Sequence, residues 1–242
     1  MKGAAVIAQS RVELLLSLRR AESLLVSFFV PIGILVFFAK VDAVNTTLRR
    51  PVDFLVPGVL ALAVMSTAMV SLGIATGFER RYGVLKRLGS TPLSRGGLLA
   101  AKTIVVLLIE IVQALAIVGA GLALGWDAER GVLLAMLWLI VGTIAFAGVG
   151  LLLAGTLRAE ANLAVANALF LILLFLGGMA YPLGRLPDVL ESFAGLLPAA
   201  ALAESVRAAL RSGGIPWDSA GVLIGWAIIA PTLAARFFRW EE

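Results

Sequence analysis

The sequence has no cysteine and no histidine among its 242 residues. Without cysteine the chain cannot form disulfides, iron–sulfur clusters or thiolate zinc sites. Without histidine it cannot form a His-ligated haem, an HExxH zinc site or a Ser-His nucleophile. Charged residues are also scarce, at 14% of the chain against about 25% in a soluble domain. We therefore assign the chain no catalytic residue and no metal ligand.

Hydrophobic residues, in contrast, make up 61% of the chain, and its mean hydropathy is +1.02. A soluble protein of this size could not bury so much apolar surface, because its outer shell must face water. The composition predicts an all-α polytopic membrane protein whose main surroundings are the lipid bilayer. The net charge of +5 is read as positive-inside topology, and no nucleic-acid partner is expected.

Six segments are apolar and long enough to be read as membrane-spanning helices. These predicted spans are 24–39, 54–78, 103–126, 131–157, 163–181 and 219–235. No domain boundary or internal repeat interrupts them, so residues 1–242 are predicted to form a single transmembrane domain.

The distribution of basic residues predicts the orientation of these spans. If the N-terminus is cytoplasmic, 13 of the 20 Lys and Arg residues fall in cytoplasmic segments, and all five Asp fall outside. Cytoplasmic loops of membrane proteins carry this excess of Lys and Arg. We expect both termini in the cytoplasm of a bacterial cell, in agreement with an even number of spans.

The first segment, 1–23, has the pattern of an amphipathic helix. Its polar side chains share one face of a helical wheel: Lys2, Gln9, Ser10, Glu13, Ser17 and Arg20. This pattern predicts a helix lying in the cytoplasmic interface before the first span. The alternative is a helical extension of that span into the cytosol.

Segment 79–95, between spans two and three, is basic and carries a short apolar repeat. Val84, Leu85 and Leu88 recur at helical spacing, while Gly83 and Gly89 bracket one or two turns. We predict a short amphipathic helix on the cytoplasmic side. A solvated loop would explain the basic residues but not the bracketed apolar repeat.

Segment 182–217, between spans five and six, is too polar to span yet has an apolar face. Pro187 and Pro198 divide it into short helical pieces. Such pieces are typical of re-entrant hairpins, which survive in a membrane only where protein or water lines the backbone. A small helical cap exposed on the outer surface is the alternative.

Glu110 is the one charged residue in segment 103–125, and Gln113 lies a turn further on the same face. A charged side chain at the bilayer centre costs about 2.5–3.5 kcal/mol on insertion scales. Two interpretations stay open at this point. The pair either lines a transport pathway, touching substrate or water, or bonds to a neighbouring helix for packing.

Two of these segments resemble the permease subunit of the type-2 ABC transporter family. That family's coupling segment often reads E-[RK]-x-x-G-[TV]-L-[KR]-x-L-x-x-[ST]-P-[LV]-[SR]. The matching residues are Glu79, Arg80, Gly83, Val84, Leu85, Lys86, Leu88, Thr91, Pro92 and Leu93. Its re-entrant segment is matched by Pro182, Leu183, Leu186, Pro187, Leu190, Pro198 and Arg207. Leu197 departs from the pattern, because the family usually has Asn there.

The resemblance implies an export subunit with an interfacial N-terminal helix, six spans and a coupling helix after span two. Its ATPase-coupling residues would be Glu79, Arg80, Arg81, Tyr82, Gly83, Val84, Leu85, Lys86, Arg87 and Leu88. It also implies a second permease copy, identical or not, and two copies of an ATP-binding subunit that hold ATP and magnesium.

The sequence agrees that ATP is bound elsewhere. Residues 96–103 resemble a phosphate-binding loop, but Ala101 replaces its second glycine and no strand precedes it. Two other functions remain open: an ion-coupled secondary transporter that uses Glu110, and a membrane assembly factor that transports nothing.

Overall fold

The structure is a computed structural model that describes residues 2–19, 21–41, 51–91, 93–127, 130–179, 182–185 and 187–241. All regular secondary structure in these ranges is helical. The elements are α1 (Lys2–Arg19), α2 (Ala21–Lys40), α3 (Pro51–Val64), η1 (Met65–Ser71), α4 (Leu72–Arg81), α5 (Val84–Gly89), α6 (Arg95–Ala123), α7 (Val132–Thr156), α8 (Ala159–Leu176), η2 (Leu183–Arg185), α9 (Asp188–Gly195), α10 (Pro198–Ser212) and α11 (Trp217–Phe237). Outside the described residues lie the stretch 42–50, which falls between the first two predicted spans, and the motif residues Pro92 and Leu186.

Within the described ranges, five helices are long and apolar enough to cross a membrane. They are Pro51–Arg81, Arg95–Ala123, Val132–Thr156, Ala159–Leu176 and Trp217–Phe237. They coincide with five of the six predicted spans, and the all-α polytopic fold is confirmed. The first of them, Pro51–Arg81, coincides with the second predicted span and is called span two below. It runs without a break through α3, the π-helical segment η1 and α4.

The other predicted span, 24–39, falls in α2. Its described apolar part, Ser27–Lys40, is shorter than the roughly 20 residues that a spanning helix needs. The pair α9 and α10 passes the same test only when taken together, and the two helices are bent by 82°. The described chain therefore has five candidate spans, or six with the bent pair, and a span at α2 stays a prediction.

Helix α7 packs between span two and α11, and glycines on opposite sides of α7 allow close approach. A Cβ on Gly150 would collide with the carbonyl oxygen of Met69 in η1. One on Gly148 would lie 2.5 Å from the backbone nitrogen of Pro231 in α11. Small residues at such positions let helix backbones touch in a membrane. Span two, α7 and α11 consequently form one closely packed unit.

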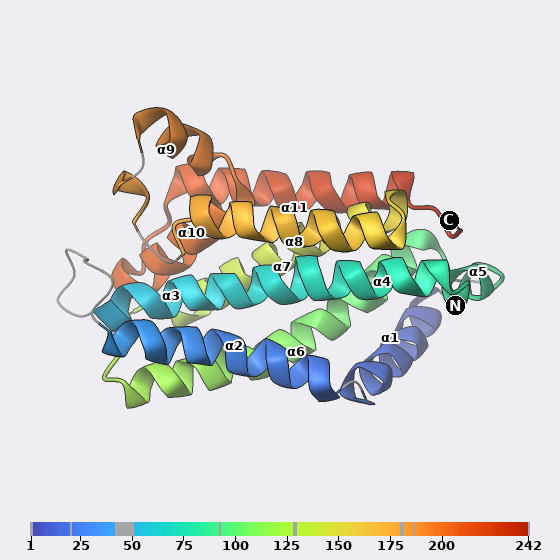
Figure 1. Cartoon of the computed structure of the whole chain (residues 1–242), viewed down its shortest axis with the longest axis horizontal. Coiled ribbons are helices and arrows are strands. Elements are labelled where there is room, and N and C mark those ends of the chain that lie inside the picture. Colours follow the sequence, from blue (N-terminus) through green and yellow to red (C-terminus); the bar gives the residue numbers. More distant parts are fainter. Residues whose placement is uncertain are drawn as a thin grey trace.

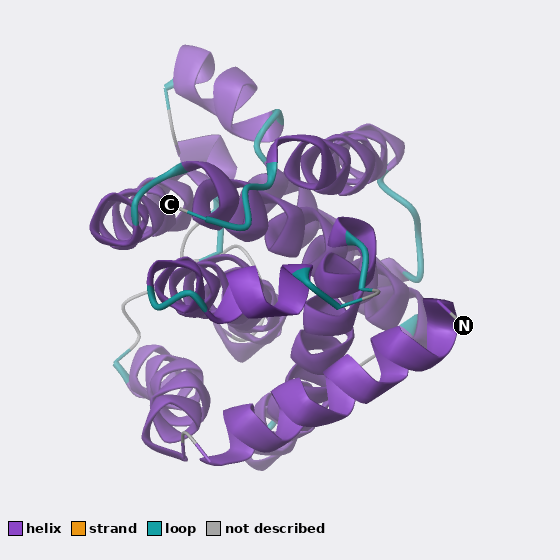
Figure 2. Cartoon of the chain, turned by 90° about the vertical axis from the view of Figure 1, so that its right-hand side faces the viewer, coloured by secondary structure: helices purple, strands orange, loops and turns teal. Residues whose placement is uncertain are grey.

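The two ends of the bundle are built differently (Figure 1). Both ends of the chain lie beside the short helix α5 at one end, while α9 lies near the other. Helix α1 does not run along the bundle but crosses this first end obliquely, as the view turned by 90° shows (Figure 2). The segment expected to be the coupling helix and the N-terminal helix are thus neighbours in space.

Candidate functional site

A short helix forms where the sequence predicts one. Span two ends at Arg81, and Gly83 follows with φ 71°, a left-handed conformation that glycine adopts without strain. Helix α5 then runs for six residues to Gly89. The next helix, α6, begins after Ser94, whose hydroxyl accepts a hydrogen bond from the backbone N–H of Gly97 at 3.1 Å. Defined turns therefore bound this part of the predicted coupling segment on both sides.

Three side chains of this segment point inward and fix it to the bundle. Arg80 is buried and donates a hydrogen bond to the carbonyl oxygen of Leu157 at the end of α7. Leu85 is fully buried within the apolar core, and Glu79 forms an ion pair with Lys102 of α6. The resemblance places Arg80 among the ATPase-coupling residues, and in the structure its buried side chain holds the segment in place.

The other side chains of the segment face outward. Tyr82 is 71% exposed and Val84 is 44% exposed, and the side chains of Lys86 and Arg87 also lie at the surface. Arg81 pairs with Glu160 at the start of α8. Gly83 and Leu88 are half-buried. The segment therefore presents a mixed apolar and basic surface on a base that is fixed to three other helices.

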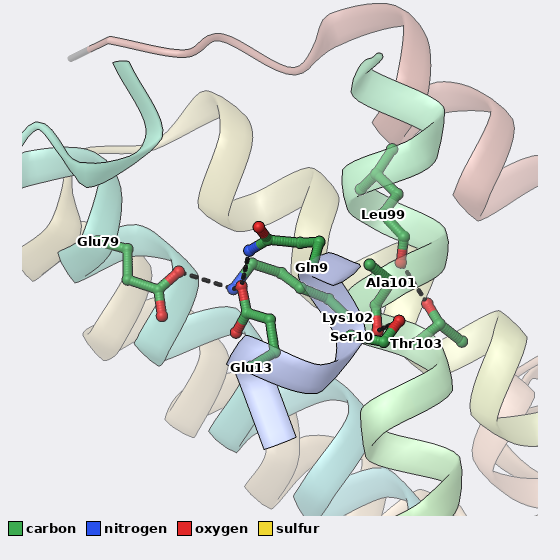
Figure 3. Close-up of polar contacts among 8 residues, drawn as sticks. All are labelled: Gln9, Ser10, Glu13, Glu79, Leu99, Ala101, Lys102 and Thr103. Atoms are coloured by element: carbon green, nitrogen blue, oxygen red, sulfur yellow. Dashed lines mark hydrogen bonds and ion pairs between the residues drawn. The ribbon is translucent and has the colours of Figure 1, made fainter. Parts of the chain in front are cut away.

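A buried charge cluster lies directly beneath this surface (Figure 3). The ammonium of Lys102, 2% exposed, lies 2.9 Å from a carboxylate oxygen of Glu13 and 2.6 Å from one of Glu79. Gln9 donates a further hydrogen bond to Glu13 at 2.9 Å. The cluster joins α1, the end of span two and the start of α6. Buried charges need partners of this kind, since their desolvation is costly.

The cluster reverses the expected role of the polar face of α1. Gln9 and Glu13 turn toward α6, and the hydroxyl of Ser10 donates to the carbonyl oxygen of Ala101 at 3.4 Å. Apolar residues are exposed instead: Ile7, Val12, Leu15, Leu16 and Leu18. Three of the predicted polar-face residues of α1, Gln9, Ser10 and Glu13, therefore contact protein, and the interfacial position of this helix stays a prediction.

A cavity of about 590 Å³ opens beside the charge cluster, between α1, α2, span two and α6. Glu13, Glu79 and Lys102 form part of its lining, and the rest includes apolar groups such as Phe78, Val106 and Ile109. Its π-helical wall, η1, contributes Thr67 and Ser71. No pattern in the sequence predicted this cavity. Among the described residues, no group of three or more Asp and Glu is placed to hold a metal ion.

Glu110 and Gln113 both lie on the buried stripe of α6. Glu110 accepts a hydrogen bond from the hydroxyl of Thr143 in α7. Gln113 accepts one from Thr67 at 3.2 Å and donates one to the carbonyl oxygen of Ser27 at 3.0 Å. These contacts join α6 to α7, to span two and to α2 inside one chain. They favour the packing interpretation of the pair over the pathway interpretation.

Replacing Glu110 tests this choice. In Glu110→Gln a side-chain oxygen can still accept from Thr143, so we expect the thermal unfolding midpoint to stay near wild type. Glu110→Leu removes this acceptor and leaves Thr143 the carbonyl oxygen of Leu139, at 2.9 Å, so the midpoint should fall by an amount equivalent to about 0.5–1.5 kcal/mol for one hydrogen bond. Reduced transport by Glu110→Gln at unchanged stability would support the pathway interpretation instead.

The predicted re-entrant segment contains two helices that meet at a sharp bend. Pro187 precedes α9, and Pro198 is the first residue of α10, where proline is tolerated because no intrahelical donor is needed. Helix α9 is mostly exposed, whereas α10 is buried between α3, α7 and α11. Pro182 is half-buried just before the turn η2.

Arg207 is the polar centre of this segment. Its guanidinium donates to the carbonyl oxygen of Gly178 at 2.9 Å and pairs with Glu204 at 2.9 Å. It also lies 4.1 Å from the ring centroid of Phe54 in span two. Arg207 thereby ties α10 to the turn after α8 and to α3.

The fold defines a polytopic helical membrane protein, and comparison with known proteins gives its family. The profile of the family described as "ABC-2 type transporter" matches residues 5–210. Because this match covers most of the sequence, the chain belongs to the ABC-2 type transporter family. The chain is also similar to the Bacillus subtilis (strain 168) protein named "Putative transport permease YvfS", with 25% identity over 237 residues and 97% of each chain covered. The resemblance found in segments 79–95 and 182–207 is thus confirmed at the level of the family.

Proposed function

We propose that this chain forms the substrate pathway of an ABC exporter in the bacterial cell membrane. In this proposal, segment Glu79–Leu88 couples the pathway to a separate ATP-binding subunit. Membership of the ABC-2 family supports it, because the family implies pairing with such a subunit. ATP and magnesium would be bound by that partner, and the chain itself would be a transport subunit without enzymatic activity.

The observation that carries the proposal is that the coupling segment is held to the bundle by buried side chains on one side and is exposed on the other. A cytoplasmic ATPase can move membrane helices only through an element that it can grip and that does not deform. Leu85 and Arg80 hold the segment to the bundle through buried contacts, whereas Tyr82 and Val84 are exposed and accessible to a partner. Arg87 adds positive charge to the same surface.

Two observations at this end of the bundle support an orientation in the membrane. The positive-inside count assigns segments 1–23, 79–102 and 236–242 to the cytoplasm, and the chain ends lie beside α5 in the fold (Figure 1). We place both termini and the coupling segment in the cytoplasm. Two copies of the permease, identical or not, would each dock one of two ATP-binding subunits. The bend between α9 and α10 would form the re-entrant hairpin on the outer side.

The double variant Val84→Asp/Arg87→Glu tests the coupling assignment. Both positions are exposed, and the variant leaves the buried contacts of Leu85 and Arg80 unchanged, so α5 should still form. We expect normal membrane insertion together with loss of co-purification with the ATP-binding subunit. Co-purification would be measured by affinity capture from detergent-solubilised membranes.

The control is Arg211→Glu/Ile215→Asp, which makes the same chemical changes at exposed positions in segment 182–217. This variant should co-purify as the wild type does. Equal recovery of the ATP-binding subunit with both variants would show that the outward surface of α5 is not the docking surface.

A further inference from the structure

After α11 the chain turns back across the end of α7. Phe238 is buried against Gly155, where an added Cβ would lie 2.6 Å from the phenyl ring and 3.0 Å from the Cα of Phe238. The next residue, Arg239, donates its backbone N–H to the carbonyl oxygen of Gly155 at 3.2 Å. This tail, Phe238–Glu241, is therefore fixed to the end of α7.

The same tail reaches α5. The indole of Trp240 lies over Gly89, the last residue of α5, where an added Cβ would be 3.3 Å from the ring. Phe238 and Trp240 pack edge to face at 5.8 Å. The Lys86 ammonium lies 3.3 Å from a carboxylate oxygen of Glu241. Since that ion pair is exposed, it contributes little, and the aromatic contact is the stronger of the two contacts between the tail and α5.

We propose that the tail Phe238–Glu241 is a mechanical link between the coupling segment and helices α7 and α11, with Trp240 as its positioning residue. The proposal rests on the proposed function, in which an ATP-binding subunit moves α5. Along the chain, α5 is connected only to span two and α6. Through the tail it also contacts the two helices that pack against each other at Gly148 and Pro231.

The physical basis is that close-packed contacts shift as units and do not deform continuously. A displacement of α5 would carry Trp240 and Phe238 with it, and Phe238 is buried against Gly155 at the end of α7. Motion would thereby reach α7 and α11 directly. The family profile matches residues 5–210, so the tail Phe238–Glu241 lies outside the matched region.

The test uses the full chain in nanodiscs, assembled with its ATP-binding subunit. Hydrogen–deuterium exchange is measured with and without ATP and vanadate, which traps the ATPase. In the wild type we expect an ATP-dependent change at α5, α7 and α11. In Trp240→Ala the change at α5 should persist and the change at α7 and α11 should become smaller, because only the contacts of span two with α7 then transmit it. Trp240→Phe keeps an aromatic ring and should restore it.

A full ATP-dependent change at α7 and α11 in Trp240→Ala would overturn the link. If Trp240→Ala does not assemble, the pair Gly89→Cys/Trp240→Cys decides, because the chain has no other cysteine. The reduced variant lacks the indole and should show the weakened change at α7 and α11, whereas closing the disulfide should restore it. A change that stays weak in the oxidised protein would contradict the link. A wild-type chain that fails to bind the ATP-binding subunit would contradict the proposed function itself, before any variant is made.

Discussion

Replacing Lys102 by methionine is expected to destabilise the protein by about 3–5 kcal/mol, the typical cost of removing one partner from a buried ion pair. The substitution keeps a long side chain but leaves Glu13 and Glu79 facing each other without their shared cation. Both side chains are mostly buried, so water cannot replace the ammonium at little cost. The thermal unfolding midpoint in detergent measures the effect.

The matched control neutralises the whole cluster. In Lys102→Met/Glu13→Gln/Glu79→Gln no buried charge remains, and buried ion clusters can often be replaced by neutral groups with little loss of stability. We expect the triple variant to recover most of the midpoint lost by Lys102→Met. A single variant as stable as the wild type would mean that the cluster does not hold α1 to α6.

Arg207→Met is expected to have the second-largest effect, a loss of about 2–4 kcal/mol. The substitution leaves the buried carbonyl oxygen of Gly178 without its charged donor and removes the contact with Phe54. Glu204 is 45% exposed and can return to water, so no unpaired buried charge is created. We therefore expect a smaller loss than for Lys102→Met.

Two measurements check this prediction. The unfolding midpoint should fall, and protease cleavage within 187–197 should become faster, because α10 loses its tie to the turn after α8. Arg207→Lys keeps the charge but not the planar guanidinium that reaches two partners. Its unfolding midpoint should lie between those of the wild type and Arg207→Met. Unchanged stability and unchanged cleavage in Arg207→Met would show that α10 is held by its apolar packing alone.

The distribution of hydrophobic residues was sufficient to predict five of the membrane-spanning helices. Five spans could be placed because a helix that crosses a bilayer must be apolar over about 20 residues. Helix α5 could be predicted because Gly83 forms the left-handed turn before it and Gly89 is its last residue. The π-helical segment η1 could not, since its widened turn is packed against the backbone of Gly150 in another helix.

The candidate site was predicted only in outline. A count of basic residues shows that segment 79–95 belongs to one side of the membrane, but it does not show which side chains turn inward. Arg80 and Arg87 look alike in the sequence, yet one is buried against Leu157 and the other is exposed. The partners of Lys102 come from two other helices, and no local spacing connects them.

The charge cluster around Lys102 also implies an order of assembly during synthesis. Glu79 precedes Lys102 by only 23 residues, so span two and α6 can pair as soon as both have left the ribosome. Helix α1 is made before both, but its contacts with α6 bridge about 90 residues, such as the 91 between Ser10 and Ala101. Glu13 must therefore remain without the Lys102 ammonium until α6 has been made. Helix α1 is in this way docked only after a helix that is made much later.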